Sequence, residues 1–215
     1  MNIPGVDRSH LNSHIPLNSL IAKGIKFIFF KATQGETYID ATFNQAWQEA
    51  KAIPQLARGC YHFFDPRVDG IVQAKHYLSL GVNFSSPGAL PPCIDVEDLV
   101  GTNEADTAAA NKWVANNWQL SLQRLNGFLA YVKLQTGKDC IIYTYNNYPK
   151  EYFRGHGFPS NPMWLSSLQA TCPARYDTGK PPLFWQNSYN WQGTDMDADV
   201  FTGTQEELNK LANIV

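Results

Sequence analysis

Residues 25–33, IKFIFFKAT, constrain the fold of this chain more than any other segment. Apolar side chains point to both faces of such a strand, so other elements must cover it on both sides, as they do in a parallel sheet. Comparable apolar runs alternate with segments of helical spacing through the first two thirds of the 215 residues. This alternation predicts an α/β fold, with a parallel sheet and helices packed outside it.

The same patterns predict the individual elements. Strands are expected over residues 3–7, 25–33, 56–64, 91–97, 140–145, 163–167, 183–187 and 196–201. Helices are expected over 16–24, 42–52, 68–80 and 104–135, the last broken near 116–119, and a capping box at Thr204 and Glu207 predicts a final helix. Because only short, turn-rich segments separate the last strands, we expect an irregular TIM-like (β/α) barrel that lacks some outer helices in its C-terminal third. No linker or repeat divides the chain, so residues 1–215 are expected to form a single domain.

Composition argues against several classes of function. The formal net charge of −2 provides no basic surface for nucleic acid. No segment approaches the ~18 apolar residues of a membrane-spanning helix, and the first residues lack the charged and apolar regions of a secretory signal. The cysteines, Cys60, Cys93, Cys140 and Cys172, form no C-x-x-C pair and permit disulfides without requiring them. We expect no nucleic-acid or membrane partner, and we interpret Cys60 and Cys93 as buried free thiols.

Polar and aromatic side chains collect where the predicted strands end. In a parallel barrel the active site lies at the carboxyl ends of the strands. The side chains found there are Asp7, Lys31, Tyr61, Asp95, Glu97, Tyr143, Trp185 and Asp197. Four acids together with several aromatic residues in this register predict a polar cleft at the mouth of the barrel.

Asp95 and Glu97 are the pair with the clearest chemistry. Two residues apart on a strand, they point the same way, with Cα atoms ~6.5–7 Å apart. At such a short distance two carboxyl groups disfavour each other's charge, so one of them is expected to hold a proton near neutral pH. A protonated acid beside an ionised carboxylate is what glycosidic bond cleavage requires. The longer Glu97 is the better general acid, and Asp95 would stabilise positive charge at the anomeric carbon or orient a group that does.

Other interpretations of these residues stay open at this point. Asp95 and Glu97 are alternatively structural ion-pair partners of Lys31 or Arg58, or metal ligands together with His62 in a metal-dependent hydrolase. His62 has no second histidine at a ligand spacing, which favours a hydrogen-bonded histidine packed between the barrel and its helices.

Two further segments allow more than one interpretation. Asp195, Asp197 and Asp199 share one strand face; Asp197 is expected to line the site, whereas Asp199 lines it too or points outward as a solvated charge. Trp185 either floors a sugar-binding subsite or packs in the core.

Taken together, these residues resemble glycoside hydrolase family 25, the Ch-type lysozymes. The matching segments are GVDRSH, GIKFIFFKATQGETYID, YHFF, PPCIDVED, IIYT, FWQ and DMDADVF, which follow the order of the family through nearly the whole chain. The resemblance implies an irregular β/α barrel that cleaves the β-1,4 bond between N-acetylmuramic acid and N-acetylglucosamine in peptidoglycan. By position, Glu97 matches the proton donor and Asp95 the second acid of the D-x-E motif.

The resemblance also assigns the remaining site residues. Asp7 and Asp197 match the other two carboxylates of the family's cleft, and Tyr61 and Tyr143 match positions that line the substrate groove. The implied protein is a bacteriolytic, antimicrobial monomer that needs no cofactor or metal and acts on the cell wall after secretion, export or release by a phage.

Two positions depart from the family pattern, and one rival function remains. Gln34 replaces the usual Glu after Lys31, which removes a possible partner of that lysine, and Leu168 replaces an aromatic residue. The main rival function is a barrel that binds carbohydrate without cleaving it.

Overall fold

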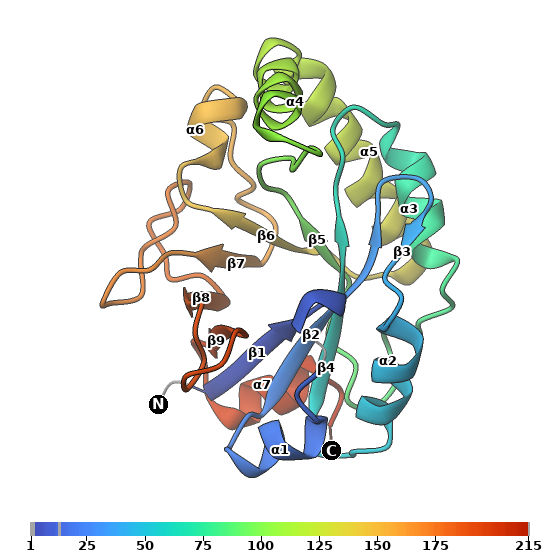
Figure 1. Cartoon of the computed structure of the whole chain (residues 1–215), viewed down its shortest axis with the longest axis vertical. Helices are drawn as coiled ribbons and strands as arrows, with labels where there is room; N and C mark the ends of the chain where they lie inside the picture. The colour runs from blue at the N-terminus through green and yellow to red at the C-terminus, as the bar shows by residue number, and fades with distance from the viewer. Residues whose placement is uncertain (1–2, 13, 215) are drawn as a thin grey trace.

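The computed structural model describes residues 3–12 and 14–214 and is built around one closed sheet (Figure 1). Its strands follow in the order β1 (Ile3–Arg8), β9 (Asp197–Phe201), β8 (Phe184–Ser188), β7 (Met163–Ser166), β6 (Ile141–Tyr145), β5 (Cys93–Asp95), β4 (Ala57–Phe63) and β2 (Phe27–Gln34). Because β1 also pairs with β2, these eight strands close into a barrel. A ninth strand, β3 (Tyr38–Ile39), forms a hairpin with β2 at the rim. The predicted TIM-like barrel is therefore confirmed.

One barrel strand runs against the others. Neighbouring strands of the barrel are parallel except at β9, which is antiparallel to both β8 and β1. Only residues 189–196 join β8 to β9, and a parallel connection needs a crossover of a dozen or more residues. The predicted parallel sheet is thus confirmed for the barrel strands other than β9. Since β9 runs backwards, the chain leaves the barrel at the end opposite the mouth, where α7 (Gln205–Leu211) lies.

The helices cover the barrel unevenly. Besides α7, the described residues form α1 (Leu17–Ala22), α2 (Phe43–Lys51), α3 (Gly70–Leu78), α4 (Glu104–Asn116), α5 (Trp118–Thr136) and α6 (Tyr148–Tyr152), together with a 3-10 helix, η1 (His10–Asn12). In Figure 1, α2, α3 and α5 lie along the side formed by β2, β4 and β5, while long loops border β7, β8 and β9. The predicted loss of outer helices in the C-terminal third is confirmed. No helix in the described part of the chain combines the length and apolarity that crossing a membrane requires.

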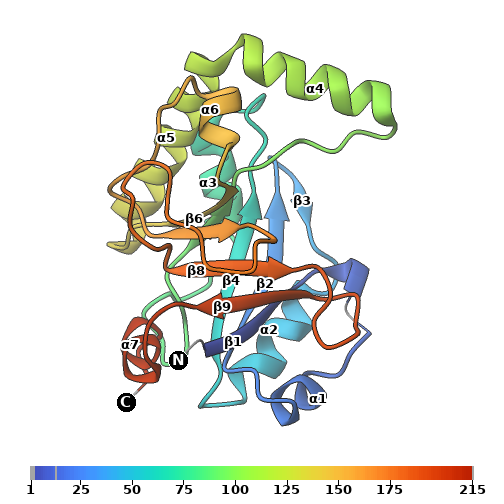
Figure 2. The same ribbon diagram turned by 90° about the vertical axis from the view of Figure 1, so that its left-hand side faces the viewer.

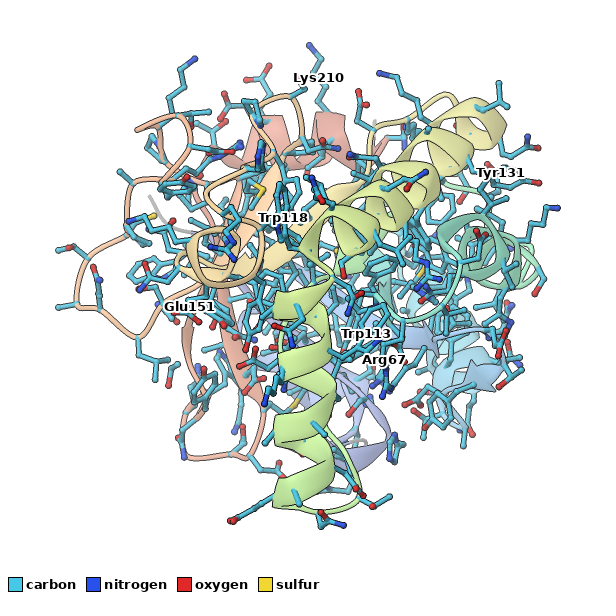
Figure 3. All side chains as sticks on the ribbon, turned by 90° about the horizontal axis from the view of Figure 1, so that it is seen from above. Arg67, Trp113, Trp118, Tyr131, Glu151 and Lys210 are labelled. Atoms are coloured by element: carbon cyan, nitrogen blue, oxygen red, sulfur yellow. The ribbon has the colours of Figure 1, made fainter. Side chains whose placement is uncertain are left out.

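The long helical region breaks at Asn117, as its sequence predicts. Asn117 adopts φ −116° and ψ 34°, outside the helical region, and its side chain donates to the Trp113 carbonyl at 2.8 Å. As a result α4 leaves the barrel at a steep angle to α5 (Figure 2). Figure 3 shows Trp113 and Trp118 beside this junction, and Trp113 faces the guanidinium of Arg124 at 5.8 Å.

Aromatic rings fill the barrel below its mouth. Phe29 stacks on Trp164 with ring centroids 4.5 Å apart, and Phe184 lies 5.0 Å from Phe27 and 5.2 Å from Phe201. We call Phe27, Phe29, Trp164, Phe184 and Phe201 the aromatic floor. These rings exclude water from the barrel interior, so any polar group that points inward above them is poorly hydrated.

Glycine on β1 makes room for this floor. A Cβ atom added at Gly5 would lie 2.4 Å from the ring of Phe27. We predict that Gly5→Ala lowers the free energy of unfolding by about 1–3 kcal/mol, the usual cost of overpacking a core. Urea unfolding measures the change.

Gly127→Ala is the matched control. Gly127 lies within α5, and an added Cβ there meets nothing nearer than Ile71 Cγ1 at 3.7 Å. This substitution is expected to stabilise the helix by up to about 1 kcal/mol. A Gly5→Ala variant as stable as the wild type would contradict the packing described here.

Candidate active site

Eight side chains meet in a cavity of about 80 Å³ at the mouth of the barrel. They come from every barrel strand except β2, and are Asp7, Tyr61, Asp95, Glu97, Tyr143, Trp164, Gln186 and Asp197. Six of these were predicted from the sequence. Parallel strands bring their carboxyl ends to one edge, which is why residues as far apart as Asp7 and Gln186, 179 positions, converge. Asp197 comes from the antiparallel β9. Because this strand runs the other way, its first residue, Asp197, lies at the mouth opposite Asp7.

Gln186 connects the two carboxylates on one side of this cavity. Its Nε2 donates to Asp7 Oδ2 at 2.9 Å and to Asp197 Oδ2 at 3.3 Å. Its Oε1 accepts hydrogen bonds from the Tyr143 hydroxyl at 2.7 Å and from Ser166 Oγ at 2.9 Å. A neutral amide thus holds two acids and a tyrosine in fixed positions without placing a charge among them.

Trp185, the neighbour of Gln186, does not line the cavity. Adjacent residues on a strand face opposite sides, so one of the two points into the barrel and the other away from it. Trp185 is buried outside the cavity, and its Nε1 donates to the Ser167 carbonyl at 2.7 Å. Of the two interpretations of Trp185, packing is the one that the structure supports.

Lys31 also lies outside the cavity lining, at the rim. Its Nζ donates to Gln34 Oε1 at 2.7 Å and lies 4.7 Å from the centre of the Phe63 ring. Burial lowers the pKa of Lys31, while the charges of Asp95 and Glu97 act to raise it. Gln34 is therefore the direct hydrogen-bond partner of Lys31, although it is not a Glu.

Two buried residues of the site have no distinguishing signal in the sequence. Trp164 lines the cavity and donates from Nε1 to Asp199 Oδ1 at 2.8 Å. Asp199 is 2% exposed, so its interpretation as an outward, solvated charge is wrong. It lies on the same face of β9 as Asp197, one step deeper in the barrel, where the closed sheet rather than solvent surrounds it.

Burial raises the pKa of every acid in this cavity. The pKa of Asp7 rises to about 8, through burial and then the charge of Asp197, against the hydrogen bond from Gln186. The pKa of Glu97 rises to about 7, through burial and then the charge of Asp98, and Lys31 opposes this shift. Burial alone raises the pKa of Asp197 to about 6.

Asp95 is the most deeply placed member of the D-x-E pair. It is 5% exposed, and no hydrogen-bond donor of the described residues reaches its Oδ1. Burial, followed by the charge of Glu97, raises the pKa of Asp95 well above its ordinary value. Because the two carboxyls interact, their protons belong to the pair rather than to either residue alone.

The structure also places the residues of the alternative interpretations. His62 points away from the cavity, where its ring contacts Thr33 Oγ1 at 2.8 Å and Gln73 Oε1 at 3.1 Å, and burial lowers its pKa to about 3. Arg58 donates to the Pro87 carbonyl and faces Trp47, away from Asp95 and Glu97. Within residues 3–12 and 14–214, no three His, Cys, Asp or Glu side chains are grouped so as to hold a metal ion. The four cysteines are free thiols, with Cys60, Cys93 and Cys140 buried.

A second hollow lies apart from these acids. It has a volume of about 670 Å³, opens between α1 and α2, and is bordered by Arg8, Asn18, Gln45 and Glu49 among others. Although it is larger, none of the cavity acids reaches it. Size alone therefore does not mark the place where the reactive groups of this chain meet.

The family described as "Glycosyl hydrolases family 25" matches residues 6–196, a span that contains seven of the eight cavity residues. This chain belongs to glycosyl hydrolase family 25. The last cavity residue, Asp197, directly follows the matched span.

Relatives of this family 25 chain come from several bacteria. YegX of Escherichia coli O6:H1 is 32% identical over 188 residues, which cover 86% of this chain and 62% of YegX. The chain thus spans less than two thirds of that relative's length. Lysozyme M1 of Streptomyces globisporus is 28% identical over 221 residues, covering 98% of this chain and 71% of the lysozyme. The structure of a family 25 glycosyl hydrolase from Bacillus anthracis superposes with a TM-score of 0.81 at 26% identity, covering 97% of this chain and 92% of the other.

Substitution of Gln186 tests how this family 25 site is held together. Gln186→Leu removes the amide that binds Asp7 and Asp197 and leaves the buried hydroxyls of Tyr143 and Ser166 without their acceptor. Because each unpaired buried group costs about 1–3 kcal/mol, we predict a loss of about 2–4 kcal/mol in the free energy of unfolding. Gln119→Leu, on the exposed start of α5, is the control and should change it by less than about 0.5 kcal/mol. Equal effects of the two substitutions in urea unfolding would contradict the role given to Gln186.

Proposed function

We propose that this family 25 chain is a lysozyme that hydrolyses the β-1,4 bond between N-acetylmuramic acid and N-acetylglucosamine in bacterial peptidoglycan. The observation that carries the proposal is the convergence of Asp95 and Glu97 on a cavity whose burial keeps carboxyl groups protonated near neutral pH. Glycosidic bond cleavage needs an acid of this kind beside a second carboxyl group. The similarity to Lysozyme M1 over 98% of this chain supports the same assignment.

Glu97 is the general acid in this proposal. It lies two residues beyond the end of β5 and is more exposed than Asp95, so it is the member of the pair that a substrate in the mouth meets first. With its pKa raised to about 7, Glu97 keeps its proton in weakly acidic solution and can give it to the leaving glycosidic oxygen. Activity should therefore decline as the pH rises through about 7.

Asp95 acts behind Glu97. Its buried carboxyl, with one oxygen that no described donor reaches, is available to a group of the substrate. In our proposal that group is the 2-acetamido substituent of the muramic acid. Asp95 orients this substituent so that the acetamido oxygen attacks the anomeric carbon. Alternatively, Asp95 stabilises the positive charge that develops at the anomeric carbon. The nearby charge of Lys31 favours the ionised form of Asp95.

The opposite side of the cavity binds and orients the sugar. Gln186 holds Asp7 and Asp197 together, and burial raises the pKa of both, so the pair can hold a proton near neutral pH and offer the sugar both a donor and an acceptor. Tyr61 and Tyr143 add ring faces and hydroxyl groups, which suit the apolar and polar faces of a sugar.

We also infer how the protein works as a whole. The eight cavity residues lie on strands of one barrel or, for Glu97, just beyond one, so a single barrel completes the site; this supports a monomer with a single catalytic domain over residues 1–215. Since peptidoglycan lies outside the cytoplasmic membrane, the proposed substrate requires that the protein reach the cell wall by secretion, export or release by a phage.

A barrel that binds carbohydrate without chemistry is the rival from another class. A binding site gains nothing from two acids held two residues apart in a poorly hydrated cavity, because each costs folding free energy when it ionises. A metal-dependent hydrolase is the third candidate, and insensitivity of the activity to a chelator would argue against it.

Digestion of purified peptidoglycan tests the proposal. Wild-type protein is expected to release fragments that mass spectrometry identifies by muramic acid at their new reducing ends. Glu97→Gln keeps the size of the side chain but has no proton to give, so its rate should fall at least about a hundredfold.

Glu151→Gln is the matched control. Glu151 lies in α6 (Figure 3), where its carboxylate accepts a hydrogen bond from Tyr145 at 2.9 Å, outside the cavity. This variant should cleave at the wild-type rate. Glucosamine reducing ends would show that the bond is wrongly assigned, equal rates for wild type and Glu97→Gln would remove Glu97 as the acid, and no cleavage by the wild type would favour the binding protein.

A further inference from the structure

Asp199 is a buried acid for which the proposed reaction has no use. It lies below the cavity on β9, where its backbone stands opposite Gly5 on one side and Gln186 on the other. One carboxyl oxygen, Oδ1, accepts from Trp164 Nε1 at 2.8 Å. The other, Oδ2, is buried, and no N–H or O–H donor of the described residues reaches it.

The group that Asp199 does meet is another carboxyl. Asp7 and Asp199 are diagonal neighbours on one face of the β1–β9 pair, so their side chains interact, and neither can donate a hydrogen bond when both are ionised carboxylates. Such a contact needs a proton between the two groups. A proton on Asp199 Oδ2 meets this need, and it also lets that oxygen take part in a hydrogen bond.

The surroundings of the pair favour the same proton. No Lys, Arg or His within the described ranges forms an ion pair with Asp7 or Asp199. The charged groups that act most strongly on the pair are themselves acids, Asp197 on β9 and Glu97 beyond β5. Trp164 on β7 and Gln186 on β8 are neutral donors that already bind Asp199 and Asp7 respectively, and the hydroxyls of Tyr61 and Tyr143 near Asp7 are neutral too. Two touching carboxyls in such a place cannot both carry charge.

We propose that Asp199 is a permanently protonated positioning residue, whose carboxylic acid group donates a hydrogen bond to Asp7 and holds that catalytic-site carboxyl against Gln186. Trp164 fixes the other oxygen of Asp199, so the acid proton points toward Asp7. Asp7 is then the member of the pair that changes charge in the working range. The part of this inference that concerns activity rests on the proposed lysozyme function, and the part that concerns the proton does not.

Burial, and after it the charge of Asp7, raises the pKa of Asp199 well above its ordinary value of 3.8. The direction of this shift determines how the stability of the protein should change with pH. Below pH 3.8 the carboxyl is protonated in both the folded and the unfolded chain. As the pH rises further, only the unfolded chain ionises, so the wild type loses stability with each pH unit. Asp199→Asn has no proton to lose, and its amide can still donate to Asp7 and accept from Trp164.

The test is urea unfolding of wild type and Asp199→Asn from pH 4 to pH 7. The unfolding equilibrium constant of the variant, divided by that of the wild type, should fall by up to about tenfold for each pH unit. A ratio that is constant or rises with pH means that Asp199 is ionised in the folded protein, which would overturn the proposal. This readout does not depend on any enzymatic activity.

A third variant separates positioning from mere packing. Asp199→Leu fills the space but cannot donate to Asp7, so kcat on peptidoglycan should fall at least about tenfold with KM within about threefold of wild type. Asp199→Asn should restore most of that loss, because its amide replaces the missing donor. Equal kcat losses in the two variants would contradict the positioning role, even if the stability test supports the proton.

If Asp199→Asn does not fold, the wild type answers the question itself. In protein labelled with ¹³C at the aspartate carboxyl carbons, the Asp199 resonance is assigned through its backbone in β9. A resonance that stays at the chemical shift of a protonated carboxyl from pH 4 to pH 7 supports the permanent proton. A resonance at the chemical shift of a carboxylate, or one that titrates within this range, overturns it.

Discussion

Poor hydration of acids inside a closed barrel is the constraint on which the rest of this structure depends. The aromatic floor, in which Phe29 and Trp164 stack 4.5 Å apart, keeps water out of the space below the cavity. An ionised carboxylate placed above such a floor loses hydration that nearby groups do not fully replace. The consequence is the same at Asp7, Asp95, Glu97 and Asp197: each has a raised pKa with burial as its first cause.

The structure accommodates these acids with neutral partners more than with cations. Gln186 and Trp164 donate to carboxyl groups from β8 and β7, while Lys31 acts on Asp95 and Glu97 only from the rim. The direction of the cost follows from the raised pKa values. The acids are compatible with the fold while protonated, and their burial lowers stability progressively as the pH rises above their ordinary values. Stability is given up here for groups that hold protons near neutral pH, as an acid catalyst of glycosidic bond cleavage must.

Much of this arrangement could be predicted from the sequence, because it depends on local patterns. Apolar runs such as residues 25–33 predict the strands, and acids at the ends of those runs predict the carboxylates of the mouth. The break between α4 and α5, and the capping box at Thr204 and Glu207, are equally local and are confirmed. The positions of Asp95 and Glu97 in one cavity follow from their spacing of two residues.

What the sequence could not provide depends on contacts between distant strands. Trp185 and Gln186 are adjacent, and choosing which of them points inward requires the register of β8 against its neighbours. Asp199 looks like a solvated acid until the reversed direction of β9 places it opposite Gly5, within the closed sheet. Trp164 has no local feature that distinguishes it from a core residue. For Trp185 and Gln186 the reason is that alternation along a strand gives two faces but does not say which one faces the cavity. Asp199 shares its face with Asp197, so its burial depends instead on the depth in the barrel that the direction of β9 gives it.

The most direct test of this account is the titration of the Glu97 carboxyl carbon by NMR, in protein labelled with ¹³C at the glutamate side chains. The account predicts a midpoint near 7, because burial and the charge of Asp98 raise the pKa from its ordinary 4.5. It also predicts a still higher midpoint in Lys31→Met, which removes the charge that lowers this pKa. A midpoint near 4.5 that Lys31→Met leaves unchanged would contradict the central claim, because Glu97 would then have no proton to donate near neutral pH.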